Sequence, residues 1–156
     1  MSSPHLSSTM QVVPDWLDYN GHMNMAYYNV LIDRAGDEMY SLMGLGEAYA
    51  KTRAHTSYTA EFHICYVREL HLGDRVQVQS QLLEFDAKRF ITWHEVWHVD
   101  GWLAATGEAL GLHIDMSGPR VVPFPDDVRA KMLALKATQA DLPRPDRAGR
   151  AIALPG

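Results

Sequence analysis

Between Met25 and Met43, apolar residues recur every three or four positions, and charged residues occupy the opposite side of the segment. This spacing is that of an α-helix with one buried face. Asn24 is placed to cap the start of the helix, and Gly44 is placed to end it. The pattern therefore predicts one long core helix, whose buried face carries Tyr28, Leu31, Ile32, Ala35, Met39, Leu42 and Met43.

After His55 the apolar residues alternate with polar ones, which is the period of a half-buried β-strand. Tyr58 and Phe62, in the first of these strands, are therefore expected on the same face. The breaks between strands are short, and Asp100-Gly101 is a strong hairpin signal. The pattern predicts an antiparallel meander of four strands, over residues 58–66, 76–82, 89–99 and 102–116.

An extended segment from Gln11 to Trp16 precedes the helix, and a short helix from Asp126 to Lys136 follows the meander. A sheet with one face to bury should curl around the one long apolar helix available. We therefore predict an α+β fold in a single domain over residues 10–138. The ends, residues 1–9 and 139–156, lack apolar periodicity, so we expect them to be mobile.

Composition narrows the possible partners and location. The chain has 156 residues and a net charge of -5, so no basic surface for nucleic acid is expected. No apolar run approaches the ~18 residues that span a bilayer, which argues against a membrane partner. The N-terminus does not read as a signal peptide, and the single cysteine cannot form an internal disulfide. We expect a cytoplasmic protein.

The start of the predicted helix carries the most informative group of residues. Asp18 precedes a Gly21-His22-x-Asn24 turn, which leads directly into Met25. A helix N-terminus presents unpaired N–H groups and partial positive charge, so a carbonyl oxyanion could be held there beside the carboxylate. This arrangement suits attack on an acyl carbonyl.

The order of elements and this motif resemble the hotdog-fold acyl-CoA thioesterases of the 4-hydroxybenzoyl-CoA thioesterase branch. The resemblance covers roughly residues 10–120. It implies that Asp18 acts as nucleophile or as base for water, and that the backbone N–H of Met25 polarises the thioester carbonyl. One departure is visible, because relatives often carry a second acid two residues before the catalytic one, where this chain has Trp16. The resemblance also implies a homodimer or homotetramer, with coenzyme A as part of the substrate and no separate cofactor.

Hydrolysis of a thioester needs few groups beyond a carboxylate and a donor to the carbonyl oxygen. Its leaving thiol has a free pKa of about 8.5, so it can depart as thiolate without a strong general acid. Asp18 can attack the carbonyl directly or remove a proton from an attacking water, and the sequence leaves both routes open. His22 is either a turn residue that positions Asp18 or a direct contact to the carbonyl or water. Asn24 fits an N-cap better than a substrate contact.

A rival motif, His94-Glu95-Val96-Trp97-His98, has the His-Glu-x-x-His spelling of zinc peptidases. Those ligands need a helix, whereas residues 90–99 alternate and are rich in β-branched and aromatic residues. On a strand the two histidines would lie about 13 Å apart, too far for one zinc ion. We therefore predict no metal site.

Cations and aromatic residues supply candidates for substrate binding. Lys88 and Arg89 are predicted to contact the CoA phosphates, with Arg68 and Arg75 behind them, although ordinary solvated turn residues would look the same. Tyr19, Tyr58 and Trp93 could line an acyl pocket, although such residues also belong to cores and subunit interfaces.

The acyl group and the reaction class are less determined by the sequence. The motif region looks similar to thioesterases associated with carnitine dehydrogenase, which points to a betainyl group that aromatic rings could hold. An aromatic or medium-chain acyl group is the second candidate. Two other functions stay open, a hotdog dehydratase or hydratase and a non-catalytic acyl-CoA-binding module.

Overall fold

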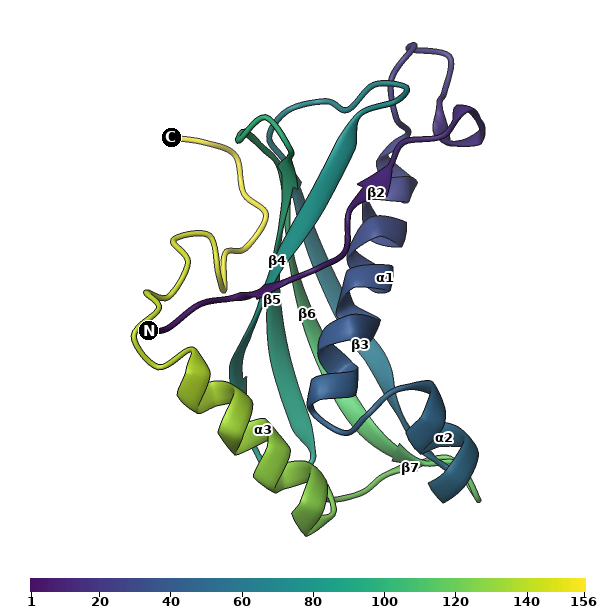
Figure 1. Ribbon diagram of the computed structural model, residues 1–156, viewed down its shortest axis with the longest axis vertical. Coiled ribbons are helices and arrows are strands. Elements are labelled where there is room, and N and C mark those ends of the chain that lie inside the picture. Colours follow the sequence, from purple (N-terminus) through teal and green to yellow (C-terminus); the bar gives the residue numbers. More distant parts are fainter.

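The computed structural model describes residues 1–156 and contains one long helix packed against an antiparallel sheet (Figure 1). The helix is α1, Met25–Leu42. The sheet has the strand order β1-β4-β5-β6-β3, with β2 also paired to β4 and β7 to β6. Its long strands are β3 (His55–Tyr66), β4 (Arg75–Phe85), β5 (Arg89–His98) and β6 (Leu103–Asp115).

The remaining elements are short, apart from a C-terminal helix. They are β1 (His5–Leu6), β2 (Met10–Gln11), the 3-10 helix η1 (Pro14–Trp16), α2 (Glu47–Arg53), β7 (Arg120–Val121) and α3 (Asp126–Thr138). No helix of the structure combines the length and the apolar character that crossing a bilayer requires.

Helix α1 begins and ends close to the predicted residues. The Asn24 side chain accepts a hydrogen bond from the Ala26 N–H at 2.9 Å, so Asn24 is the N-cap. The helix ends at Leu42, and Gly44 follows with φ of +74°. Its buried face carries Tyr28, Leu31, Ile32, Ala35, Gly36 and Met39.

The inner face of the sheet closes over this helix with alternate residues. On β4, Val76, Val78 and Leu82 are almost fully buried. The core has two parts, one around the first half of α1 and one that joins the second half of α1 to α3. The curled sheet around one helix confirms the predicted α+β hotdog architecture, and it leaves the N-terminus of α1 at one end of the sheet (Figure 1).

The faces of β3 differ from the prediction. The pairing of β3 with β6 shifts register between Thr59 and Glu61, so Ala60 is an extra residue in the strand. Phe62 then lies opposite the buried Ala109, whereas Tyr58 lies opposite Leu112, three residues further along β6. Residues three apart on a strand point to opposite faces. The expectation that Tyr58 and Phe62 share a face is therefore wrong.

The segment before α1 also differs from the prediction. Only Met10–Gln11 pairs as a strand, and Pro14–Trp16 forms a 3-10 helix in place of the expected extended segment. The physical reason is Pro14, which has no N–H for a strand ladder and whose fixed φ suits the first turn of a helix. Helix α2 was not predicted from the sequence, because seven residues are too few to establish a helical period.

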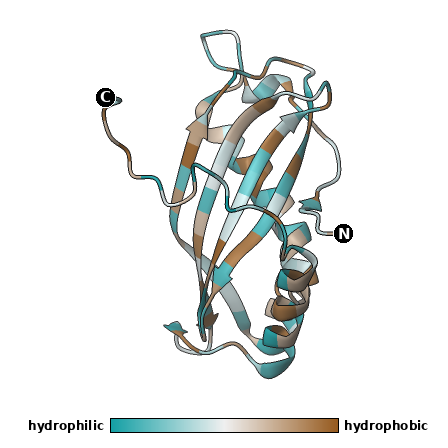
Figure 2. Ribbon diagram, turned by 90° about the vertical axis from the view of Figure 1, so that its left-hand side faces the viewer, coloured by the Kyte–Doolittle hydropathy of each residue, from teal (hydrophilic) through white to brown (hydrophobic).

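Both ends of the chain have contacts with the domain. Strand β1 pairs with β4, and the Ser3 N–H donates to the Thr138 carbonyl at the end of α3. The C-terminal segment passes over the sheet face away from α1 (Figure 2), where the Gly149 N–H donates to the Glu108 carboxylate at 2.9 Å. The mobility expected for residues 1–9 and 139–156 stays a prediction.

Candidate active site

The turn before α1 holds the Asp18 carboxylate in a defined position. The Asn20 N–H donates to Asp18 Oδ1 at 2.8 Å, and the Gly21 N–H donates to the Asp18 carbonyl at 3.0 Å. Gly21 has φ of +81°, a conformation that residues with a Cβ rarely adopt. The local sequence around residue 21 therefore fixes one carboxylate oxygen by a backbone hydrogen bond.

Asn24 joins this carboxylate to the helix. Its Nδ2 donates to Asp18 Oδ2 at 3.2 Å, while its Oδ1 caps the Ala26 N–H. Its carbonyl accepts the Tyr27 N–H at 3.1 Å. The N–H of Met25 is left at the first helical position, where no acceptor exists inside the helix. One amide side chain thus places the carboxylate and the start of α1 side by side.

His22 points to the loop between β3 and β4 and has no hydrogen bond to the Asp18 carboxylate. Its Nδ1 lies 3.2 Å from the Met23 carbonyl, and its Nε2 lies 3.3 Å from a Glu69 oxygen. Glu69 was not identified from the sequence, because it lies 47 positions after His22 and belongs to no recognisable motif.

A cavity of about 210 Å³ opens at the start of α1. It is lined by His22, Met23, Met25, Tyr28, Tyr66, Val67, Arg68 and Glu69. The Tyr66 hydroxyl donates to the Met25 carbonyl at 2.9 Å, and the rings of Tyr28 and Tyr66 meet edge to face at 5.1 Å. Burial raises the pKa of Tyr28, whose hydroxyl accepts the Leu70 N–H. Asp18 does not line this cavity, but the Asn24 side chain joins the Asp18 carboxylate to the N–H of Ala26, the residue after Met25.

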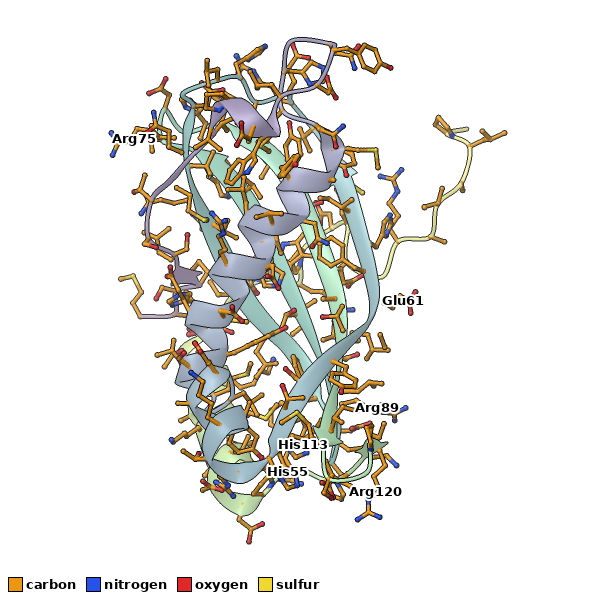
Figure 3. The ribbon with its side chains drawn as sticks, turned by 90° about the vertical axis from the view of Figure 1, so that its right-hand side faces the viewer. His55, Glu61, Arg75, Arg89, His113 and Arg120 are labelled. Atoms are coloured by element: carbon orange, nitrogen blue, oxygen red, sulfur yellow. The ribbon has the colours of Figure 1, made fainter.

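Lys88 and Arg89 lie at the other end of the protomer. Figure 3 shows Arg89 near His55 and His113, far from Arg75. Arg89 starts β5, whose ten residues span about 30 Å before His98. His98 lies at the end of the sheet where α1 begins, 3.4 Å from Asp74. The single chain therefore does not bring Lys88 and Arg89 to the Asp18 turn.

Arg89 is also already paired with a carboxylate. Its Nε and one terminal nitrogen contact Asp86 at 2.7 Å and 2.5 Å. The Arg89 guanidinium, with two backbone N–H groups, lowers the pKa of Asp86 to about 2. A phosphate at this position would compete with an ion pair that is already formed.

The predicted aromatic residues do not line the cavity at the helix N-terminus. Tyr19 is 98% exposed on the turn, and Tyr58 is 47% exposed on β3. Trp93 is buried, and its Nε1 donates to Glu95 at 3.0 Å. The aromatic residues that do line the cavity, Tyr28 and Tyr66, come from α1 and from the end of β3.

The strand prediction for the His-Glu-x-x-His segment is confirmed, since it lies in β5. His94 is fully buried, with its ring nitrogens 2.7 Å from the Ser80 hydroxyl and 2.9 Å from the Thr92 hydroxyl. Burial lowers its pKa to about 4, so the ring is neutral at pH 7. It faces a second cavity, of about 330 Å³, between α1 and β3, which Ile32 and Phe62 also line. No three metal-binding side chains gather anywhere in the chain.

Comparison with known proteins places this geometry in a family. The family model described as the thioesterase-like superfamily matches residues 12–132. The chain belongs to this superfamily. The prediction of a thioester hydrolase is thereby confirmed at the level of the family, and the turn, Asn24 and the start of α1 all lie within the matched part of this thioesterase.

Two curated relatives are similar over most of this thioesterase. Betainyl-CoA thioesterase from Pseudomonas aeruginosa is 36% identical over 145 residues, which cover 92% of this chain and 91% of the relative. L-carnitine dehydrogenase/betainyl-CoA thioesterase from Agrobacterium fabrum is 36% identical over 137 residues, 88% of this chain. The match spans only 28% of that longer relative.

Among solved structures, a Staphylococcus aureus protein in complex with CoA matches with a TM-score of 0.90. It is 28% identical, and the match covers 99% of both chains. The dihydroxynaphthoyl-CoA thioesterase Slr0204 from Synechocystis, at 17% identity and a TM-score of 0.72, shows the same fold.

Proposed function

We propose that the protein hydrolyses an acyl-CoA thioester with Asp18 beside the scissile carbonyl and the Met25 N–H bonded to the carbonyl oxygen. The observation that carries this proposal is the Asn24 side chain, which bonds both the Asp18 carboxylate and the first turn of α1. A carboxylate and a helix N-terminus held together in this way can act on the two atoms of one carbonyl group.

Two routes use this geometry. In the first, an Asp18 oxygen attacks the carbonyl carbon, CoA leaves as thiolate, and water then cleaves the resulting mixed anhydride. In the second, Asp18 takes a proton from a water that attacks directly, and the thiolate leaves in the same way. Both routes yield the carboxylic acid and CoA. Label recovered in the Asp18 carboxylate after single-turnover hydrolysis in ¹⁸O-labelled water would establish the first route, because water that attacks the anhydride at the Asp18 carbon leaves its oxygen there and the second route never does.

The Asp18→Asn variant tests the function itself. Asn keeps the size and one hydrogen-bonding oxygen but loses the charge, so we expect kcat to fall about a hundredfold or more. Thiol release from an acyl-CoA panel measures the rate, and CoA titration checks that binding is retained. Equal rates for the wild type and the variant would contradict the role of Asp18.

The same assay separates the other two function classes. If the protein is a binding module, the wild-type protein binds CoA but releases no thiol from any acyl-CoA. A dehydratase or hydratase would change the absorbance of an enoyl-CoA without releasing thiol. Thiol release is therefore the decisive measurement for the hydrolase.

We propose betainyl-CoA as the first substrate to examine, since two similar relatives bear that name. Its cationic nitrogen lies one methylene group from the carbonyl, so it would occupy the cavity at the start of α1. The rings of Tyr28 and Tyr66 and the Glu69 carboxylate line this cavity, and aromatic faces and carboxylates attract a quaternary ammonium group.

An aromatic or medium-chain acyl group is the second candidate. The cavity between α1 and β3 favours it, because Ile32 and Phe62 provide apolar walls there. It begins at Asn29, one turn along α1 from Met25, which lies within reach of a longer acyl chain. The relative kcat/KM values for betainyl-CoA, acetyl-CoA, benzoyl-CoA and octanoyl-CoA discriminate between the candidates.

We also propose a homodimer. Strand β3 pairs with β6 on one side only, so a twelve-residue edge of the sheet is open to a second copy. Light scattering coupled to size exclusion measures the assembly, and a tetramer is the alternative outcome.

A further inference from the structure

Arg68 has no carboxylate partner, and it differs from Arg75, which has none either, because its guanidinium is stacked on an aromatic ring. Arg53 pairs with Asp127, Arg89 with Asp86 and Arg120 with Asp115. The exposed Arg68 guanidinium instead lies over the ring of Trp102, 4.1 Å from its centroid. Such stacking orients a guanidinium while its N–H donors stay available to a ligand.

The His98 ring stacks on Trp102 as well, and the backbone of Arg68 is held by a hydrogen bond. The Trp102 ring lies parallel to the His98 ring, with centroids 4.5 Å apart and planes 7° apart. The Nε2 atom of His98 lies 3.4 Å from an Asp74 oxygen. The N–H groups of Val67 and Arg68 both donate to the Ala104 carbonyl, at 2.9 and 3.0 Å. The guanidinium is therefore supported from its ring face and from its own backbone.

The position of Arg68 connects it to the candidate active site. Arg68 lines the cavity of about 210 Å³ that also contains Met25 and His22. The neighbouring Glu69 does not neutralise it, because the Glu69 oxygens contact His22 at 3.3 Å and His71 at 3.4 Å. Arg68 therefore supplies an oriented guanidinium without an ion-pair partner to the lining of this cavity, in a chain whose net charge is -5.

We propose that Arg68, oriented by Trp102, binds a phosphate group of the CoA portion of the substrate. This proposal rests on the proposed function, since the CoA nucleotide supplies the anion. A free guanidinium fork matches phosphate geometry and can form two charge-assisted hydrogen bonds. Arg89, in contrast, would have to give up its contacts with Asp86 to do the same.

Titration calorimetry of the intact protein with CoA itself tests the site without any reaction. Arg68→Gln is expected to weaken CoA binding by about tenfold to a hundredfold, the range for a lost charge-assisted contact. Binding of pantetheine, which has no phosphate, should not change. Trp102→Leu should weaken CoA binding less, because it removes the support of the guanidinium but leaves the charge.

Arg34→Gln is the matched control. The Arg34 guanidinium also lies over a tryptophan, 5.3 Å from the Trp16 ring, and has no ion pair, but Arg34 does not line the cavity. It should bind CoA as the wild type does. Equal weakening in the Arg34 and Arg68 variants would overturn the proposal, because it would show a general effect of net charge. Weakening by Arg89→Gln with none by Arg68→Gln would also overturn it.

Two further ligands identify the phosphate. If the wild type and Arg68→Gln bind dephospho-CoA equally well, Arg68 contacts the 3′-phosphate. If Arg68→Gln still binds 4′-phosphopantetheine more weakly than the wild type does, Arg68 contacts the phosphate next to pantetheine. Loss of CoA affinity in Arg68→Gln without thiol release by the wild type would support the phosphate site and contradict the hydrolase. Thiol release by the wild type with unchanged CoA affinity in Arg68→Gln would support the hydrolase and contradict the phosphate site.

Discussion

At the scale of single residues, Asn24 performs two tasks that are usually assigned to separate side chains. Its oxygen caps α1 and its nitrogen bonds Asp18, so the cap and the carboxylate share one rotamer. The roles of Asp18, His22 and Met25 stay predictions, but the structure brings these residues together within a single turn. Local residues hold Asp18, whereas the His22 ring also contacts Glu69, which lies far away in the sequence.

Glu69→Gln tests how far His22 depends on that contact. The His22 ring has two acceptor partners, the Met23 carbonyl and the Glu69 carboxylate, and the variant replaces the carboxylate with a neutral amide. The pair is partly exposed and correspondingly weak, so we expect kcat/KM to fall about two- to fivefold. The difference from the wild type should shrink in 1 M salt, which screens such a pair.

Glu84→Gln provides the control, because Glu84 is an exposed glutamate on β4 with no ion pair. If both variants lose activity equally, His22 does not depend on Glu69. If neither does, the contact has no part in turnover.

At the scale of elements, strand pairing fixes features that strand periodicity alone leaves undetermined. Phe90 on β5 lies opposite Gly111 on β6, and its ring covers the glycine. A Cβ at position 111 would lie 2.6 Å from Phe90 Cε2. Phe90 is 1% exposed, so its ring has little room to move.

Gly111→Ala should therefore destabilise the fold by about 1–3 kcal/mol, the usual effect of overpacking a core. The free energy of unfolding in urea measures the change. Gly118→Ala is the matched control, since nothing lies within 4 Å of the added Cβ, and we expect a change of about 0.5 kcal/mol or less. A Gly111→Ala variant as stable as the control would show that the Phe90 ring can shift.

At the scale of the whole molecule, the two buried histidines make stability depend on pH. Burial lowers the pKa of His94 to about 4, and it also lowers the pKa of His113. The unfolded chain therefore binds more protons than the folded chain below the ordinary value of about 6.5. The contribution of His94 to stability is complete above about pH 6.5 and is lost as the pH falls toward 4, and the contribution of His113 is lost in the same direction.

We expect His94 alone to reduce the free energy of unfolding by about 3 kcal/mol between pH 7.5 and pH 4. Urea unfolding at pH 7.5, 6.5, 5.5 and 4.5 measures the slope. Carboxylates with lowered pKa values, such as Asp86, titrate below this window. A flat profile down to pH 5 would mean that His94 is not held neutral by burial.

Local spacing in the sequence was enough to predict the long helix, its N-cap, the order of the main strands and the turn with Asp18. These features depend on neighbours a few residues apart, where period, capping and turn chemistry act. The predicted strand before α1 was wrong because Pro14 favours a helical turn over strand pairing. Helix α2 was not predicted because seven residues are too few to show a helical period.

Tertiary structure alone decided what surrounds the turn. Arg68, Glu69 and Tyr66 reach the start of α1 from about 40 positions further along the chain, and Trp102 from still further. The bulge at Ala60, which turns Tyr58 away from Phe62, exists only through the pairing of β3 with β6. Lys88 and Arg89 are adjacent cations in the sequence, yet the length of β5 carries them to the opposite end of the sheet. A chain's local pattern determines its elements, but which side chains meet depends on register and strand length, and only the folded chain sets these.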